Sequence, residues 1–202
     1  KLCQRFVAGR KLESDFKYVG YQIVQQSNGA IMNQQSYVDN IASIELSKER
    51  ESQKYESLSS EELSKYRSLV GSLNWLVQGT RPDLAFYLIK LSTKLNCGQV
   101  KDFLQVRRIL NKAKDNKVDV FFPCLGKVDC WKLVVFADAP HANLSNNTGS
   151  CIGYIIFLVG ENDASCPLLW KSGKAKRVVK STIAAEAMAL SEGMDEAIYL
   201  RS

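Results

Sequence analysis

The sequence has 202 residues, of which 46% are hydrophobic, and its formal net charge is +6, from 27 basic and 21 acidic side chains. This length suits one or two domains and allows a sizeable buried core. No apolar run reaches membrane-spanning length and the first residues lack a signal-peptide pattern, so no membrane partner is expected. The positive charge favours a polyanionic partner, although many basic proteins have none.

Cysteine and histidine usage excludes several classes of site. The six cysteines, at positions 3, 97, 124, 130, 151 and 166, include no Cys-x-x-Cys pair, and His141 is the single histidine. Zinc sites and most histidine-dependent triads are therefore not expected. Three cysteines lie in or beside apolar runs, which predicts reduced, buried thiols in an intracellular protein. His141 follows Pro140 in a loop and is predicted to be exposed.

The N-terminal part predicts a hairpin, a short helix and a linker. Apolar and polar residues partly alternate from Phe16 to Val24, which predicts one strand. Asn28-Gly29 predicts a hairpin turn, and Ala30 to Met32 is expected to form the returning strand. A short helix is expected over roughly Gln34 to Ile44. Ser43 to Ser60 is charged and serine-rich without an apolar period, so a flexible linker is predicted.

Three helices are predicted next. Ser59-x-x-Glu62 is a capping box that opens the first, and Gly79 ends it. Pro82 and Asp83 favour the start of the second. The expected buried faces are Leu63, Tyr66, Val70, Leu73 and Val77 in the first helix, and Leu84, Leu88, Leu91 and Leu95 in the second.

The third helix is expected from about Val100 to Lys114, with Phe103, Val106 and Leu110 buried. It also carries several basic residues, which are predicted to form mostly a solvated face, with nucleic-acid backbone contact as the alternative. These residues are Lys101, Arg107, Arg108, Lys112 and Lys114. A short strand is expected at Val118 to Phe122.

The last third of the sequence predicts three strands followed by a helix. Trp131 to Asp138 is an apolar run that ends in an acid, and Cys151 to Gly160 is a second run, reached through a turn-rich stretch. A third strand begins at Pro167-Leu-Leu-Trp170. Ser181 or Thr182 can cap the helix that follows.

Two carboxylates in this last part are candidate metal ligands. An apolar stripe is expected along the helix, formed by Ile183, Ala187, Leu190, Met194 and Ile198, and Glu186 lies at its edge. A strand packed under the helix would bring Asp138 close to Glu186. Mg²⁺ prefers carboxylate oxygens, and two ions about 4 Å apart can activate a water and stabilise the leaving oxygen of a phosphodiester. The alternative is that Asp138 ends a strand and Glu186 is a solvated helix residue.

Four consecutive segments carry a family resemblance. They are Val135-Phe-Ala-Asp138-Ala, Gly149-Ser-Cys-Ile-Gly-Tyr-Ile-Ile-Phe-Leu, Leu169-Trp-Lys-Ser and Lys180-Ser-Thr-Ile-Ala-Ala-Glu186-Ala-Met-Ala-Leu-Ser-Glu-Gly. In this order they resemble the ribonuclease H domain of copia-type retrotransposon polyproteins. One departure is that the family commonly has a second Asp two residues after the first, where this chain has Pro140.

In that family the strand Asp and the helix Glu are metal ligands, and they match Asp138 and Glu186. The resemblance therefore implies that both are catalytic, with two Mg²⁺ ions, in hydrolysis of the RNA strand of an RNA–DNA hybrid. The family's third ligand lies on a strand after this helix, whereas this sequence ends at Ser202. Asp195, about 13 Å further along the helix, cannot replace it. The metal site is therefore expected to be incomplete as the sequence stands.

A basic cluster before the helix is the candidate for holding the nucleic acid. It consists of Lys171, Lys174, Lys176, Arg177 and Lys180. Lysine and arginine contacts to phosphates supply sequence-independent affinity that falls with salt, and an RNA–DNA hybrid is recognised by its shape. A solvated strand end explains the cluster equally well.

The earlier part of the chain resembles the same polyproteins. The hairpin and short helix resemble the end of the reverse transcriptase, while Tyr66-Arg-Ser-Leu-Val-Gly-Ser-Leu and Thr80-Arg-Pro-Asp-Leu-Ala-Phe resemble the segment joining polymerase to ribonuclease H. Tyr37-Val-Asp39-Asn40 looks like the polymerase signature Tyr-x-Asp-Asp. It is predicted to lie in a helix after the hairpin, so no catalytic role is expected, and the polymerase acids would precede Lys1.

The predicted fold class is α+β, with a helical thumb and connection segment followed by a partial ribonuclease H-like α/β domain of three strands and a helix. The expected divisions are 1–58, the end of the reverse transcriptase; 59–126, the thumb and connection helices; and 127–202, the N-terminal half of the ribonuclease H-like domain. The expected partners are an RNA–DNA hybrid and the polymerase palm of the same polyprotein, in a cytoplasmic particle or the nucleus.

Two other classes of function are considered. A catalytically inactive transposon remnant, or a fragment that only binds nucleic acid, is the main alternative. A nucleotide-binding α/β enzyme is not supported, because no glycine-rich phosphate loop follows any strand.

Overall fold

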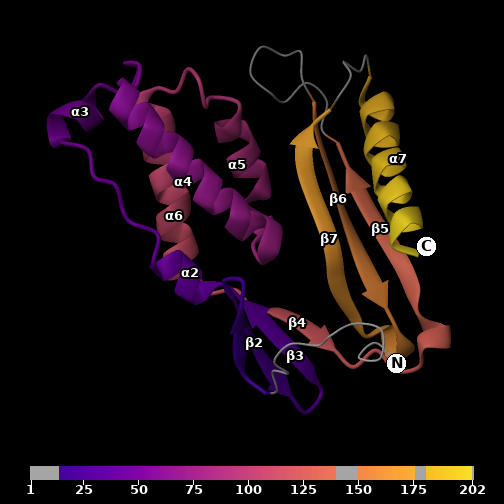
Figure 1. Cartoon of the computed structure of the whole chain (residues 1–202). Coiled ribbons are helices and arrows are strands. Elements are labelled where there is room, and N and C mark those ends of the chain that lie inside the picture. The colour runs from indigo at the N-terminus through magenta and orange to yellow at the C-terminus, as the bar shows by residue number, and fades with distance from the viewer. Residues whose placement is uncertain (1–13, 140–149, 176–180, 202) are drawn as a thin grey trace, which may run out of the picture.

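The structure is a computed structural model that describes residues 14–139, 150–175 and 181–201 (Figure 1). Within these ranges a four-stranded sheet lies below a group of helices, and a three-stranded sheet with one long helix stands beside them (Figure 1). The predicted α+β class is therefore confirmed. In the described ranges, no helix is long and apolar enough to cross a membrane.

The four-stranded sheet is antiparallel throughout, in the order β1 (Phe16–Tyr18), β2 (Tyr21–Gln26), β3 (Gly29–Asn33) and β4 (Val120–Pro123). The prediction of one continuous strand at its start is wrong. The chain reverses at Val19 and Gly20, whose φ angles are +47° and +84°, so Tyr18 pairs with Tyr21. The predicted hairpin at Asn28-Gly29 is confirmed, since Gln26 pairs with Gly29. The strand expected near Val118 is β4, which joins the sheet along β3.

The helical group consists of α2 (Gln35–Asp39), α3 (Lys48–Ser52), α4 (Ser60–Gly79), α5 (Ala85–Ser92) and α6 (Val100–Asp115), with a 3₁₀ turn at Pro82–Leu84. The predicted capping box of α4 is present, because the Glu62 amide donates to Ser59 Oγ and the Ser59 amide donates to Glu62 Oε2 at 2.7 Å. The expected apolar faces of α4, α5 and α6 meet in one buried cluster, with Leu63 and Leu95 only partly buried.

The stretch predicted to be a flexible linker contains an ordered helix, so that prediction is wrong for α3. Ser47 caps α3 by accepting a hydrogen bond from the Arg50 amide. Arg50 then pairs with Glu62 at 2.8 Å, and Glu51 accepts from Arg107 at 2.6 Å. These ion pairs fix the helix on α4 and α6 without an apolar face, which is why the absence of hydrophobic periodicity was misleading.

The C-terminal part consists of β5 (Lys132–Asp138), β6 (Cys151–Val159), β7 (Ser165–Lys174) and α7 (Thr182–Arg201), with 3₁₀ turns at Val128–Cys130 and Glu161–Asp163. The strands form an antiparallel sheet in chain order. The three strands and the following helix agree with the prediction. Ser181 caps α7, because its Oγ accepts a hydrogen bond from the Ala184 amide.

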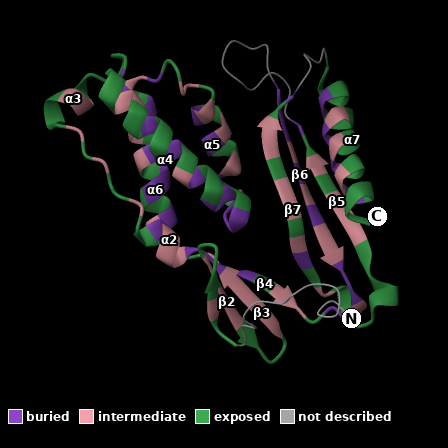
Figure 2. Cartoon of the chain, viewed as in Figure 1, coloured by how far each residue is buried: buried purple, intermediate pink, exposed green. Residues whose placement is uncertain are grey.

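The buried face of α7 differs from the prediction. Its buried residues are Ala185, Ala189, Gly193 and Ala197, which recur every fourth position. The expected stripe is instead largely exposed, with Ile183 78% and Ile198 63% accessible. Small residues let the helix approach closely: a Cβ added at Gly193 would lie 2.8 Å from Val135 Cγ1. Figure 2 shows the buried residues along the side of α7 that faces the sheet.

No disulfide joins the cysteines in the described ranges. Cys151 and Cys166 are buried, and burial raises the pKa of both thiols, as expected for inert core cysteines. Cys97, Cys124 and Cys130 are exposed. His141 and Pro140 lie outside the described residues.

Candidate active site

Asp138 is the last residue of β5, where it is exposed and pairs with Gly153 of β6. In the next pairing Gly153 faces Ser172 of β7, so Asp138, Gly153 and Ser172 form one row across the sheet. Directly opposite residues in an antiparallel sheet share a face. The side of the sheet on which Asp138 lies therefore follows from which helices contact the neighbouring rows of side chains.

The sheet face that α7 covers carries the row before Asp138. Ala137, Tyr154 and Lys171 form this row, and Lys171 Nζ donates to Glu192 of α7 at 3.2 Å. The other face points toward the helical group, because Trp170 Nε1 donates to the carbonyl oxygen of Val77 in α4 at 2.7 Å. Since side chains alternate along a strand, Asp138 lies on the face of Trp170 and Ser172, away from α7.

Glu186 is an exposed residue in the second turn of α7. It follows Ala185, which packs in a buried cluster with Ala139 and Ala189. The end of β5 and the start of α7 therefore meet at the same end of the sheet. The expected closeness of the Asp138 and Glu186 carboxylates stays a prediction. No hydrogen bond joins Asp138 to Glu186 among the contacts of the described chain, and the two carboxylates approach this end from different sides.

The described residues include no group of three or more His, Cys, Asp or Glu side chains that could hold a metal ion. Asp138 and Glu186 supply oxygen donors of the kind that Mg²⁺ prefers. They do not by themselves complete a magnesium site, so the metal prediction for both residues stays a prediction.

The two described members of the basic cluster, Lys171 and Lys174, lie on opposite faces of the sheet. Lys171 lies on the α7 side with its ammonium beside Glu192 and 5.8 Å from the Tyr154 ring centroid. Burial alone would lower the pKa of Lys171, but the hydrogen bond to Glu192 and the nearby Tyr154 and Glu196 outweigh it and raise that pKa. Lys174 is exposed and, by alternation, shares the face of Asp138. Lys176, Arg177 and Lys180 lie outside the described residues.

A pocket of about 580 Å³, here called the sheet-face pocket, contains Asp138 in its wall. Phe136, Ile155 and Trp170 line it from the sheet, and Phe86 of α5 lines it from the helical group. Phe136 is 60% exposed and contacts Phe157 edge to face, with centroids 5.9 Å apart. No local sequence signal marks Phe86 or Phe136 as site residues, because they meet only when the helix and the strand come together in the folded chain.

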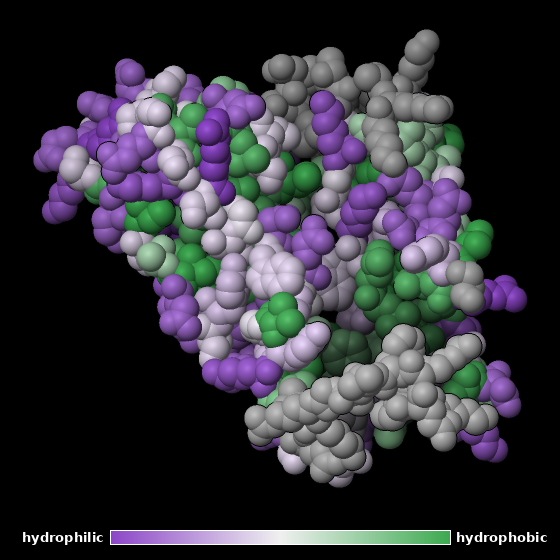
Figure 3. Space-filling model, in the orientation of Figure 1, coloured by the Kyte–Doolittle hydropathy of each residue, from purple (hydrophilic) through white to green (hydrophobic). Residues whose placement is uncertain are grey.

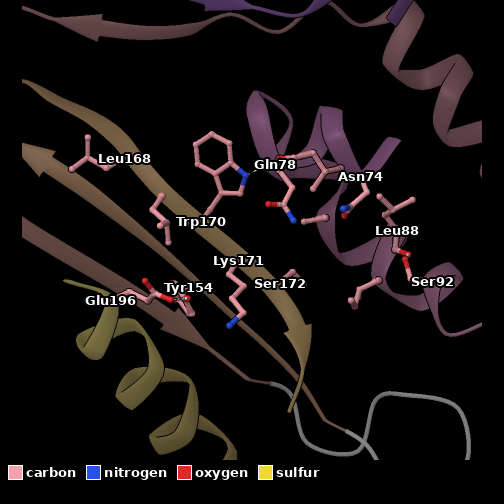
Figure 4. A pocket seen from close by; sticks show the side chains of 14 residues that line it. Asn74, Gln78, Leu88, Ser92, Tyr154, Leu168, Trp170, Lys171, Ser172 and Glu196 are labelled. Carbon is pink, nitrogen blue, oxygen red and sulfur yellow. Dashed lines mark hydrogen bonds between the residues drawn. The ribbon is translucent and has the colours of Figure 1, made fainter. Parts of the chain in front are cut away.

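A second pocket, of about 440 Å³, lies at the free edge of β7. Figure 4 shows Trp170 directed toward Gln78 and Asn74 of α4, while Tyr154 and Glu196 lie on the α7 side of the sheet. The Tyr154 hydroxyl donates to Glu196 Oε1 at 3.4 Å. This pocket lies between β7 and the helices α4 and α5, beside the Trp170–Val77 hydrogen bond.

The polymerase-like tetrapeptide does not lie at a turn between strands. Tyr37, Val38 and Asp39 belong to α2, as predicted, and Asn40 follows it. Val38 is buried, and the Tyr37 hydroxyl donates to the Ser72 carbonyl oxygen at 3.1 Å. These contacts give the segment a role in packing α2 on α4.

The surface differs between the two halves of the molecule. Figure 3 shows a mostly hydrophilic surface over the helical group and a patch of hydrophobic residues over the C-terminal sheet. The exposed apolar residues of that half include Phe136, Leu168 and Leu190. Phe136 also lines the sheet-face pocket.

Known proteins similar to this chain include transposon polyproteins and a secreted effector protein. The chain is 30% identical over 139 residues, or 69% of its length, to the retrovirus-related Pol polyproteins from transposons RE1 and RE2 of Arabidopsis thaliana. It spans only 9% of the length of each of these two relatives. No family model matches the chain.

The third relative is similar over most of its own length. It is the secreted RxLR effector protein 161 of Plasmopara viticola, which is 32% identical over 136 residues, covering 67% of this chain and 90% of that protein. The chain therefore belongs to the same family as this Plasmopara viticola protein, and it is distantly related to one region of the copia-type Pol polyproteins.

Proposed function

We propose that the chain is a part of a retroelement Pol polyprotein that acts on RNA–DNA hybrids, with β5–β7 and α7 forming the first half of a ribonuclease H-like domain. The observation that carries the proposal is the meeting of the β5 end and the α7 start, which puts Asp138 and Glu186 at one end of one sheet. The distant relation to the Arabidopsis Pol polyproteins supports the same assignment.

The proposed reaction is Mg²⁺-dependent hydrolysis of the RNA strand when further acidic ligands are present. A bound magnesium pair supplies charge stabilisation and an activated water in such reactions. Because the described residues do not complete the metal site, we assign no step of the hydrolysis to this chain alone. Its own contribution is to present Asp138 on the sheet face that points toward the helical group, and Glu186 on α7.

Binding of the hybrid is the part of the function that this chain can perform by itself. Lys174 lies on the same face as Asp138, and the chain carries a net charge of +6. Cationic side chains beside the carboxylates offset the repulsion that the acids exert on phosphates. The described cysteines form no disulfide, which fits the reducing, intracellular setting of the proposal.

The experiment uses a labelled RNA–DNA hybrid in Mg²⁺, with the 202-residue chain beside a version that continues past Ser202 in the reading frame. We expect both to bind the hybrid and the longer version to release cleaved RNA. Asp138→Asn and Glu186→Gln should abolish cleavage by the longer version while leaving hybrid binding and folding intact.

Asp195→Asn is the matched control, because Asp195 is an exposed carboxylate on the same helix as Glu186. Cleavage that survives in Asp138→Asn or Glu186→Gln would remove that residue from the site. Hybrid binding without cleavage by either version would favour the inactive, nucleic-acid-binding remnant. Failure of both versions to bind the hybrid would overturn the proposed function.

A further inference from the structure

A groove of about 240 Å³ runs between α5 and α6, on the helical group rather than on the sheet. Its eight lining residues, here called the α5–α6 groove, are Leu84, Tyr87, Lys90, Leu91, Gln105, Arg108, Ile109 and Lys112. Three of them are cationic and none is acidic. Buried Leu84, Leu91 and Ile109 form the floor, while Lys90, Arg108 and Lys112 are exposed at the rim.

The rim cations differ from the other basic residues of α6 in what they contact. Arg107 forms ion pairs with Glu51 and Glu45, and Lys114 Nζ donates to the Ile41 carbonyl oxygen at 2.7 Å. These two side chains are held by the fold. In contrast, Lys90, Arg108 and Lys112 form no ion pair among the contacts of residues 14–139, 150–175 and 181–201.

Two aromatic rings lie beside the rim cations. Tyr87 is 52% exposed and has Lys112 Nζ 5.7 Å from its centroid, and Phe86 is 38% exposed with Lys90 Nζ at 4.3 Å. Their ring centroids are 6.0 Å apart in an edge-to-face arrangement. Exposed aromatic faces flanked by cations are the arrangement on which nucleic-acid bases stack while their phosphates are neutralised.

The aromatic pair also connects the groove to the candidate active site. Tyr87 lines the α5–α6 groove, whereas its neighbour Phe86 lines the sheet-face pocket that contains Asp138. A nucleic-acid strand that extends from Asp138 toward the helices would therefore pass Phe86, then Tyr87, and then the three rim cations. This continuity is present because Asp138 lies on the sheet face that points toward the helices.

We propose that the α5–α6 groove binds the sugar–phosphate backbone of a nucleic acid, with Lys90, Arg108 and Lys112 contacting phosphates and Tyr87 stacking on an unpaired base or a terminal base pair. The groove is a second contact that extends beyond the carboxylates, and it rests on the proposed function for the identity of the nucleic acid. Arg108 and Lys112 are one helical turn apart, about 6 Å along α6, so the two cations engage neighbouring phosphates.

An acidic peptide is the competing ligand for a cationic groove. The exposed rings favour the nucleic acid, because stacking needs a planar partner that acidic side chains do not offer. The aromatic continuity with the sheet-face pocket favours it for the same reason. Poly-glutamate therefore serves as the comparison ligand in the test.

The test measures fluorescence anisotropy of a labelled RNA–DNA hybrid with a single-stranded overhang, over a range of salt concentrations, with the 202-residue chain. The groove variant is Lys90→Gln/Arg108→Gln/Lys112→Gln. The control variant, Lys48→Gln/Lys65→Gln/Lys127→Gln, removes the same charge from exposed lysines elsewhere. We expect the groove variant to bind at least about tenfold more weakly and to lower the salt slope by about 2 to 3, whereas the control changes affinity less than about twofold.

A second pair of variants tests the stacking. Tyr87→Ala is compared with Tyr55→Ala, because Tyr55 is also exposed and also lies beneath a lysine, Lys101, at 4.8 Å. Only Tyr87→Ala should weaken overhang binding. Circular dichroism confirms that each variant keeps the wild-type helix content.

The outcomes separate the groove from the proposed function. Equal losses of hybrid affinity in the groove and control variants would overturn the proposed role of the groove. The proposed function would stand in that case, because the wild-type chain still binds the hybrid. Equal binding of poly-glutamate and hybrid would assign the groove to acidic peptides. Absence of any salt-dependent binding by the wild-type chain would overturn both.

Discussion

The indole of Trp170 in β7 donates a hydrogen bond to the carbonyl oxygen of Val77 in the last turn of α4, at 2.7 Å. Carbonyls in the last turn of a helix have no partner within the helix, so this donor satisfies a group that is otherwise dependent on water. The contact joins the C-terminal sheet to the helical group. It also shows which face of the sheet points toward the helices, and Asp138 of β5 lies on this same face.

We expect Trp170→Phe to destabilise the chain by about 1–2 kcal/mol, because it keeps most of the ring but leaves the Val77 carbonyl oxygen without its donor. Urea unfolding followed by circular dichroism measures the loss. Trp131→Phe is the control, since Trp131 Nε1 donates to Leu125 at a longer 3.3 Å and its side chain is 41% exposed. Equal losses in both variants would show that the Val77 contact does not couple the two halves.

Arg81 is a buried cation that donates hydrogen bonds to carbonyl oxygens at the C-terminus of α6. It is 3% exposed, donates to the Asn116 carbonyl oxygen at 2.9 Å and pairs with Asp83 at 2.9 Å. Arg81→Met should cost about 2–4 kcal/mol in unfolding free energy, since the α6 carbonyl and the Asp83 carboxylate lose their partner.

The control for Arg81 is Arg67→Met. Arg67 also donates to a backbone carbonyl, that of Leu95 at 2.7 Å, but it is exposed, so water replaces the lost donor. Its cost should stay below about 1 kcal/mol. A loss at Arg81 no greater than at Arg67 would argue against a buried cap.

Gly193 and Gly71 are two helical glycines that should respond in opposite directions to alanine. At Gly193 a Cβ would meet Val135 Cγ1 at 2.8 Å, whereas at Gly71 nothing lies within 4 Å. Gly71→Ala should stabilise the chain by about 0.5–1 kcal/mol through helix propensity. Gly193→Ala should instead destabilise it by about 1–3 kcal/mol, because α7 must move off the sheet. Thermal unfolding of both variants checks the sign, and stabilisation at Gly193 would contradict the close packing of α7.

Glu62 links stability to pH. Its hydrogen bond from Arg50 lowers its pKa to about 2, with the Ser59 amide adding to the effect, although burial opposes it. The folded pKa is below the unfolded value of about 4.3, so the stabilisation is present above that value and is lost as pH falls toward 2.

We expect Glu62→Gln to lower unfolding free energy at pH 7 by about 1–2 kcal/mol and to flatten its decline between about pH 5 and pH 2. The expected loss is small because solvent partly screens the Arg50–Glu62 ion pair. Urea titrations across that range measure the effect. Glu61→Gln, whose side chain is 78% exposed, is the control and should keep the wild-type pH profile. An unchanged profile in Glu62→Gln would disprove the linkage.

Local sequence signals predicted the elements whose causes are local. The capping box at Ser59, the apolar faces of α4 and α6, the turn after Gln26 and the cap at Ser181 all depend on residues within a few positions of one another. The sequence also predicted that a strand under the last helix would bring Asp138 close to Glu186, and this closeness stays a prediction. Their roles as metal ligands stay a prediction.

Contacts between distant segments decided the rest. Patterning along the chain predicted the α+β class and the order of three strands and a helix in the last third. The packing of α7 through Ala185, Ala189 and Gly193 depends on the sheet beneath it, because Val135 and Tyr154 leave no space for a side chain at Gly193. Likewise, only the packing of β7 against α4 and α5 decided that Asp138 faces the helices, since strand alternation defines two faces but not which one is covered.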